Sequence, residues 1–176
     1  MRAHPLIIKT LAQPTIDWLK AKGVSPKAMI QTWSGQSSLI MAAHGDRARD
    51  GRFDPDPEGK NWFVFEEECD RVFWHQKSGD IATYEGRSFA LGQEMIGNPA
   101  TTAFDQWLNI YSGPLEWLQH ERDGIVVINR GFAFDRLRDV TRMAVAEPML
   151  ATYRKNMKPP HMPTLAVLRV AERLSA

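Results

Sequence analysis

Residues that could bind a metal or transfer a proton are concentrated in the first half of the chain. A single residue separates His44 from Asp46, and His75 follows further along the chain. An imidazole and a carboxylate that meet in space can share a divalent metal or move a proton. The pattern therefore allows a small metal-dependent hydrolase that uses His44, Asp46 and loop carboxylates, with His75 as a further member. No H-E-x-x-H or G-x-S-x-G motif accompanies these residues.

A second metal hypothesis comes from Asp54, Asp56 and Glu58, which are followed by Gly59. This spacing matches the opening of a calcium-binding loop, in which alternate carboxylates surround the cation and glycine allows a sharp bend. The position of the closing carboxylate is occupied by Phe65. We therefore favour an acidic, solvated loop here and predict no cofactor.

Basic side chains are most frequent in the C-terminal third. Residues 121–176 contain ten basic and six acidic side chains, whereas residues 45–100 contain seven and twelve. Clustered arginine and lysine side chains favour phosphate, nucleic acid or an acidic protein surface as a partner. The basic N-terminal segment could add to such a surface. The candidate contacts are Arg130, Arg136, Arg154, Lys155 and Lys158.

Aromatic residues offer a different kind of binding surface. The chain has six tryptophans and eight phenylalanines, more than a core of this size needs. Exposed aromatic side chains are enriched at protein interfaces because they contribute contact area at low entropic cost. Trp74, in a predicted strand, and Trp107 and Trp117, in predicted short helices, are the candidates for a protein-binding surface.

The composition bears on compartment and membrane association. Apolar runs extend over only a few residues, so we expect neither a membrane span nor a signal peptide. Cys69 is the only cysteine, which excludes an intramolecular disulfide and fits the reducing cytoplasm. The net charge of +1 does not by itself demand a polyanionic partner.

We expect one domain over residues 1–176, beginning with a helical part at residues 1–43. Gly23 separates two predicted helices, and the second is expected to start at Ser25-Pro26. Residues 44–60 combine glycine, proline and charged side chains, a composition typical of an exposed loop. The C-terminal residues 159–176 are predicted to form a helix or an edge strand.

The remaining residues, 61–158, predict an α+β core. Short runs of aromatic and β-branched residues indicate an antiparallel β-meander over about residues 61–92. Two short helices are expected next, after Thr101 and after Pro114. A β-α-β-α segment follows, in an order typical of a parallel crossover. Its expected strands and helices are 125–128, 132–140, 143–146 and 148–157.

These patterns favour a non-catalytic intracellular binding or accessory protein. It would engage nucleic acid through its basic N- and C-terminal segments, or a protein partner through an aromatic surface. The metal-dependent hydrolase is the alternative, because no group of chemically reactive residues carries a specific motif.

Overall fold

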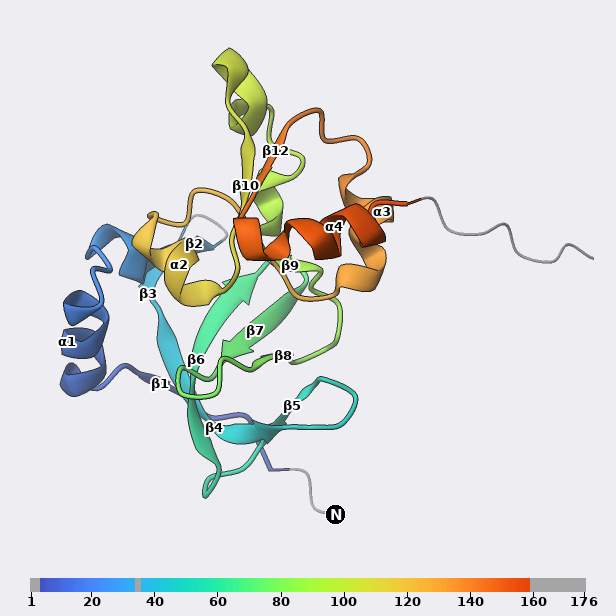
Figure 1. Ribbon diagram of the computed structural model, residues 1–176. Coiled ribbons are helices and arrows are strands. Elements are labelled where there is room, and N and C mark those ends of the chain that lie inside the picture. Colours follow the sequence, from blue (N-terminus) through green and yellow to red (C-terminus); the bar gives the residue numbers. More distant parts are fainter. Residues whose placement is uncertain (1–3, 34–35, 159–176) are drawn as a thin grey trace, which may run out of the picture.

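The computed structural model describes residues 4–33 and 36–158 and combines helices with mainly antiparallel strands (Figure 1). The predicted α+β class is therefore confirmed. Within these residues, no helix is long and apolar enough to cross a bilayer. The strands are β1 (Ile8–Thr10), β2 (Ile30–Trp33), β3 (Gln36–Leu39), β4 (Met41–Arg47), β5 (Phe53–Pro55), β6 (Lys60–Glu67), β7 (Asp70–Trp74), β8 (Ile81–Thr83), β9 (Ala90–Leu91), β10 (Leu108–Ile110), β11 (Val126–Val127) and β12 (Met143–Val145). The α-helices are α1 (Gln13–Ala21), α2 (Pro114–Gln119), α3 (Ala133–Leu137) and α4 (Leu150–Asn156), and the 3₁₀ helices are η1 (Lys27–Met29), η2 (Gln93–Met95), η3 (Pro99–Asp105), η4 (Arg130–Phe132) and η5 (Glu147–Met149).

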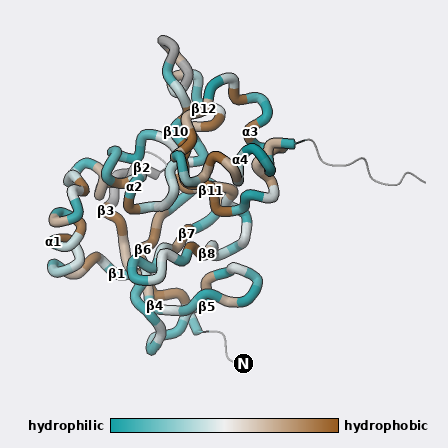
Figure 2. The backbone as a smooth tube through the Cα atoms, viewed as in Figure 1, coloured by the Kyte–Doolittle hydropathy of each residue, from teal (hydrophilic) through white to brown (hydrophobic). Residues whose placement is uncertain are grey.

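A six-stranded antiparallel sheet organises the first half of the molecule. Its order is β1–β4–β6–β7–β8, with β5 paired to β4. β6 is apolar on both faces, as its alternation predicts: Trp62 and Val64 belong to one hydrophobic cluster, Phe63 and Phe65 to the other. Hydrophobic residues accordingly gather around β6 in Figure 2. A strand of this kind requires cover on both sides of the sheet.

Helices and aromatic side chains provide that cover. On one face, Leu19 of α1 and Trp117 of α2 pack with Phe65 in a single cluster. On the opposite face, Phe53 of β5 stacks on Phe73 of β7 with ring centroids 3.7 Å apart and planes 3° apart. Burying an aromatic side chain of this size contributes about 2–3 kcal/mol.

A smaller group of strands, which we call the small sheet, follows in the second half. β9 pairs with β11 antiparallel, β10 pairs with β12 in parallel, and a parallel bridge joins Ile110 to Ile125. The predicted meander over residues 61–92 is thus correct for β6, β7 and β8, but its last strand, β9, belongs to the small sheet. The predicted crossover contains the expected strand, helix, strand and helix. Its two strands are not neighbours, because β10 lies between them.

Among residues 4–33 and 36–43 the structure has one α-helix instead of the two predicted over residues 1–43. Ser25 does cap the turn expected there, and its Oγ accepts a hydrogen bond from the N–H of Ala28 at 3.2 Å. That turn, η1, ends at Met29, and the chain continues as β2, which pairs with β3 in a hairpin. Pairing between strands takes the backbone hydrogen bonds that a longer helix would use.

The polar segment 44–60 is not the exposed loop that its composition predicts. β4 runs into it, β5 pairs with β4, and the register places Asp46 opposite Asp54. Phe53 is the physical reason, because its buried ring stacks on the sheet. One aromatic side chain anchors an otherwise polar hairpin.

Two further expectations concern the second half. The helix predicted after Thr101 is replaced by η3 and β10, and Asn98 rather than a threonine caps η3 by accepting a hydrogen bond from the N–H of Ala100 at 3.0 Å. The short helix predicted after Pro114 is confirmed as α2. The predicted helix or edge strand in residues 159–176 lies outside the described residues.

Two buried carboxylates in the β6–β7 hairpin hold the chain that leads to the small sheet. Asp70 accepts hydrogen bonds from the backbone N–H groups of Arg71, Glu85 and Arg87 at 2.7 Å each and of Ser88 at 3.3 Å. Glu67 Oε1 accepts one from the N–H of Gly92 at 2.8 Å. Segment 85–92 is therefore fixed by side chains of the first sheet. We call these two residues the carboxylate clamp.

The clamp predicts a strong effect for Asp70→Asn. The amide has one acceptor oxygen and would turn an NH₂ group toward backbone donors, so we expect a loss of about 3 kcal/mol in the free energy of unfolding. Urea denaturation measures this loss. Glu68→Gln, at an exposed neighbour, is the control and should change the free energy by less than about 0.5 kcal/mol. Equal stability of the two variants would contradict the clamp.

Glu67 predicts a pH dependence. Burial raises the pKa of its carboxyl to about 8 from 4.5, the charge of Glu94 adds to this, and the Gly92 N–H and the Arg122 guanidinium oppose it. Since the folded-state pKa lies above the unfolded value, the contribution of Glu67 is complete below pH 4.5 and is lost as the pH rises through 8.

Glu67→Gln removes this titration while keeping an acceptor for Gly92. We expect the variant to gain stability relative to the wild type between pH 5 and 8, by at most about 4–5 kcal/mol. Urea denaturation at several pH values checks this, with Glu68→Gln as the control. A difference between wild type and Glu67→Gln that does not change with pH would disprove the assignment.

Candidate functional site

The residues of the predicted hydrolase each contact a different neighbour, and the charge of Asp46 acts on the pKa of His75. Nδ1 of His44 lies 3.3 Å from the carbonyl oxygen of Gly59, and Oδ1 of Asp46 lies 3.5 Å from Nζ of Lys60. Nδ1 of His75 lies 2.8 Å from Oγ of Ser78. Burial, with the charge of Lys60, lowers the pKa of His75. Each of the three predicted residues thus has a different partner.

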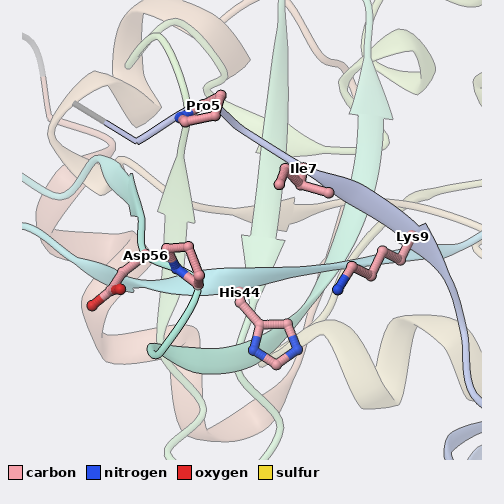
Figure 3. Close-up of a pocket in the computed structure, with 6 residues that line it drawn as sticks. Pro5, Ile7, Lys9, His44 and Asp56 are labelled. Atoms are coloured by element: carbon pink, nitrogen blue, oxygen red, sulfur yellow. The ribbon is translucent and has the colours of Figure 1, made fainter. Parts of the chain in front are cut away.

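His44 lines a small pocket together with Lys9 and Asp56 (Figure 3). The carboxylate of Asp56 is turned away from the imidazole, whereas the amino end of Lys9 lies on the imidazole side. The pocket volume is about 60 Å³, far below the range of about 300–1,000 Å³ typical of ligand sites. This pocket therefore gives little support to a hydrolytic centre.

The acidic run 54–58 is also spread out. Asp54 is exposed in β5, and Oδ1 of Asp56 accepts a hydrogen bond from the N–H of Glu58 at 3.0 Å in a tight turn. Among the residues that the structure describes, no three histidine, cysteine, aspartate or glutamate side chains are grouped as metal ligands. The calcium-loop spacing at Asp54, Asp56 and Glu58 is accounted for by a hairpin.

Two of the three tryptophans predicted to form an aromatic surface are buried. Trp74 is 4% exposed and Trp117 is fully buried, with its Nε1 donating to the carbonyl oxygen of Gly124 at 2.8 Å. Trp107 is 54% exposed and precedes β10, next to the η3 segment that projects from the body in Figure 1. The predicted surface is thus wrong for Trp74 and Trp117, because both fill the core beside the first sheet.

The predicted basic residues of the C-terminal third do come together. η4, α3 and α4 pack against one another, and we call residues 129–158 the basic corner. This segment has seven basic and three acidic side chains, a net charge of +4. The cations are all exposed. They include Arg130 on η4, Arg136 on α3, Arg154 and Lys155 on α4, and Lys158 after it.

An exposed aromatic residue that the sequence analysis missed lies in the basic corner. Phe132 is 55% exposed and ends η4, two residues after Arg130. Its ring is available for stacking, while Ala133 and Leu137 of the following helix are buried. The adjacency of Phe132 to Arg130 was the available signal in the sequence.

The described part of the basic N-terminal segment lies apart from this surface. In Figure 1, α1 is at the left edge of the molecule, whereas α4 runs from near the centre to the right. Lys27, after α1, is moreover paired with Glu121. The expectation that the two basic ends form one binding face stays a prediction, whereas η4, α3 and α4 do gather exposed cations near the C-terminal end.

An open cleft of about 570 Å³ separates the edge of the six-stranded sheet from the small sheet. The first sheet contributes Arg47, Asp80 and Thr83 among others, and the opposite wall is residues 127–130, where β11 passes into η4. Arg130 thus belongs both to the basic corner and to the cleft. Arg47 was missed because it stands at the start of the segment predicted to be a loop.

Comparisons with protein-family models, with curated proteins and with solved structures found no match for this chain. The candidate site therefore rests on its own geometry: a cationic corner with an exposed aromatic ring, bordered by a cleft.

The scattered acidic residues predict that divalent metals do not stabilise the fold. We expect the melting temperature to change by less than about 1 °C on addition of EDTA, Ca²⁺ or Zn²⁺, because a ligand that binds only the folded state would raise it. Differential scanning fluorimetry checks this. A metal-induced rise that disappears in Asp54→Asn/Asp56→Asn would restore the metal hypothesis.

Proposed function

We propose that the protein is a nucleic-acid-binding protein whose contact surface is the basic corner. The observation that carries the proposal is the convergence of exposed cations from η4, α3 and α4 around an exposed phenylalanine. Arginine and lysine neutralise backbone phosphates, and an aromatic ring stacks on unpaired bases. Single-stranded nucleic acid fits this combination better than a duplex, whose bases are already stacked.

The charge distribution supports this choice of surface. The basic corner carries +4, whereas the whole chain carries only +1. Such a local excess steers a polyanion to one part of the surface even when the net charge is small. Cys69 as the sole cysteine is compatible with a cytoplasmic location, which is part of the proposal.

A protein partner is the second candidate, and Trp107 favours it. This side chain is half exposed beside the projecting η3 segment, and exposed tryptophans are frequent anchors of protein interfaces. The basic corner is the stronger candidate because several elements contribute to it.

The proposal predicts salt-dependent binding of a fluorescein-labelled 20-nucleotide single-stranded DNA, measured by fluorescence anisotropy at two salt concentrations. Arg154→Glu/Lys155→Glu/Lys158→Glu should abolish or strongly weaken binding. If each cation neutralises one phosphate, the log–log salt slope should fall by about two units, at about 0.7 per contact. Phe132→Ala should weaken binding by about 1–3 kcal/mol with little change in that slope.

The matched control is Lys9→Glu/Lys20→Glu/Lys22→Glu, which makes the same charge change at exposed positions of the N-terminal segment. Binding by the control should stay close to that of the wild type, and both triple variants should melt near the wild-type temperature, since exposed charges contribute little to stability. Equal losses of binding affinity in both triple variants would show that binding depends only on net charge, and would contradict the proposal. Absence of binding by the wild type would leave the Trp107 surface as the better candidate.

A further inference from the structure

Two guanidinium groups, those of Arg47 and Arg130, line the cleft beside the basic corner. Nε of Arg47 donates to the carbonyl oxygen of Ile81 at 3.0 Å, and Nη2 of Arg130 lies 3.9 Å from the sulfur of Met149. Within the described part of the chain, neither arginine forms an ion pair. Planar guanidinium groups recognise phosphate oxygens in pairs of hydrogen bonds. The two cleft walls therefore each present a phosphate-binding group.

A buried hydroxyl in the cleft wall is also without a partner. Ser88 is 5% exposed, lines the cleft, and its Oγ forms no hydrogen bond with the described residues. Its backbone N–H is held by Asp70 at 3.3 Å. Because a buried polar group without a partner destabilises a fold, such a group in a native protein requires an explanation. A ligand oxygen in the cleft would supply the missing partner.

Two acidic residues, Asp50 and Asp80, also line the cleft. Asp50 Oδ2 lies 3.6 Å from Nε of Arg52, so this carboxylate has its own counter-ion. Asp80 accepts a hydrogen bond from the hydroxyl of Ser78 at 2.5 Å and stands next to Gly79. The carboxylate of Asp80 can accept further hydrogen bonds, which the hydroxyl groups of a sugar could donate.

A second depression, of about 510 Å³, meets the cleft at Gly79. Its walls include Trp74, Leu115 and Pro148, which give it an apolar character. Gln76 lines it as well, and the buried Oε1 of this residue has no partner among the described residues. A flat, largely apolar group with an N–H donor would fit this environment.

We propose that the cleft and the adjoining depression together bind one nucleoside monophosphate. The phosphate lies between Arg47 and Arg130 and accepts a hydrogen bond from Ser88. The ribose lies beside Asp80 at the junction, and the base enters the depression toward Gln76. Each volume is within the range of about 300–1,000 Å³ typical of small-ligand sites. Of the cations in the basic corner, this site includes only Arg130.

Isothermal titration calorimetry of the full chain with AMP, adenosine and inorganic phosphate tests the assignment. We expect AMP to bind with a Kd below about 1 mM, and adenosine and phosphate to bind at least about tenfold more weakly, because each fills one part of the site. Failure of AMP to bind at about 5 mM, or equal affinity for AMP and inorganic phosphate, would refute the two-part site.

Ser88→Ala is the decisive variant, because it removes a hydroxyl that forms no hydrogen bond with the described residues. We expect about tenfold weaker AMP binding together with an unchanged or higher melting temperature of the unliganded protein. A merely structural Ser88 would give unchanged AMP affinity, and that result would overturn the proposal.

Two further substitutions separate the parts of the site. Arg130→Gln should weaken both AMP and phosphate, whereas Gln76→Leu should weaken AMP alone. Arg138→Gln is the control, since Arg138 is exposed, pairs with Asp139 at 3.6 Å and is absent from both walls. Equal effects of Arg130→Gln and Arg138→Gln on AMP binding would reduce the result to surface charge and contradict the site.

The proposals of a nucleotide site and of a nucleic-acid surface can be disproved independently of each other. AMP binding without oligonucleotide binding would uphold the site and remove the proposed function. Oligonucleotide binding without AMP binding would do the reverse.

Discussion

The arrangement of the molecule depends on two side-chain carboxyl groups that are buried away from water and accept hydrogen bonds from backbone N–H groups. Asp70 and Glu67 stand at the two ends of the β6–β7 turn and bind segment 85–92, the only covalent path from the first sheet to the small sheet. Burying such groups is unfavourable unless hydrogen bonds replace the lost water. Asp70 satisfies this condition with four N–H donors. Glu67 satisfies it less completely, and its carboxyl accordingly takes up a proton more readily, with a pKa of about 8. The first carboxylate fixes the path of the chain, and the second makes the junction sensitive to pH.

The same clamp explains how a cleft can exist beside a well-packed sheet. A backbone hydrogen bond to Asp70 holds Ser88, and its hydroxyl has no partner within the part of the chain that the structure describes. Gly86 has a φ of +76°, which L residues rarely adopt. This glycine lets the chain turn next to the Arg52 side chain, between Glu85 and Arg87, whose N–H groups both bind Asp70. The cleft is thus lined by backbone that Asp70 holds in place and by one arginine on each of its two walls, Arg47 and Arg130. A rigid wall of this kind keeps polar groups available for a ligand instead of letting them pair with each other.

Local pattern was sufficient for some of this structure. The alternation in β6 identified a strand buried on both faces, and glycine and proline positions correctly located α2 and the helices of the basic corner. The local sequence pattern gave a wrong prediction where a contact between residues far apart in the sequence determines the structure. Phe53 converts a polar segment into a hairpin through its stack on Phe73, and nothing near it in the sequence indicates that partner. The roles of Glu67 and Asp70 have no local signal in the sequence, because most of their backbone donors lie 15 to 25 residues away.

The candidate sites were likewise predictable in part: single residues could be identified in the sequence, but their positions relative to one another could not. Arg130, Arg136 and Arg154 were identifiable as cations in the sequence, and packing of η4, α3 and α4 brings them together. Sequence could not show that α1 lies apart from α4 in the folded chain. It also could not show that Arg47, from β4, and Arg130, from η4, line one cleft. Residues from such distant parts of the chain meet only because the clamp sets the small sheet against the edge of the first sheet. A substitution that loosens Asp70 should therefore disturb the cleft more than it disturbs the basic corner, whose helices pack mainly on one another and on the small sheet.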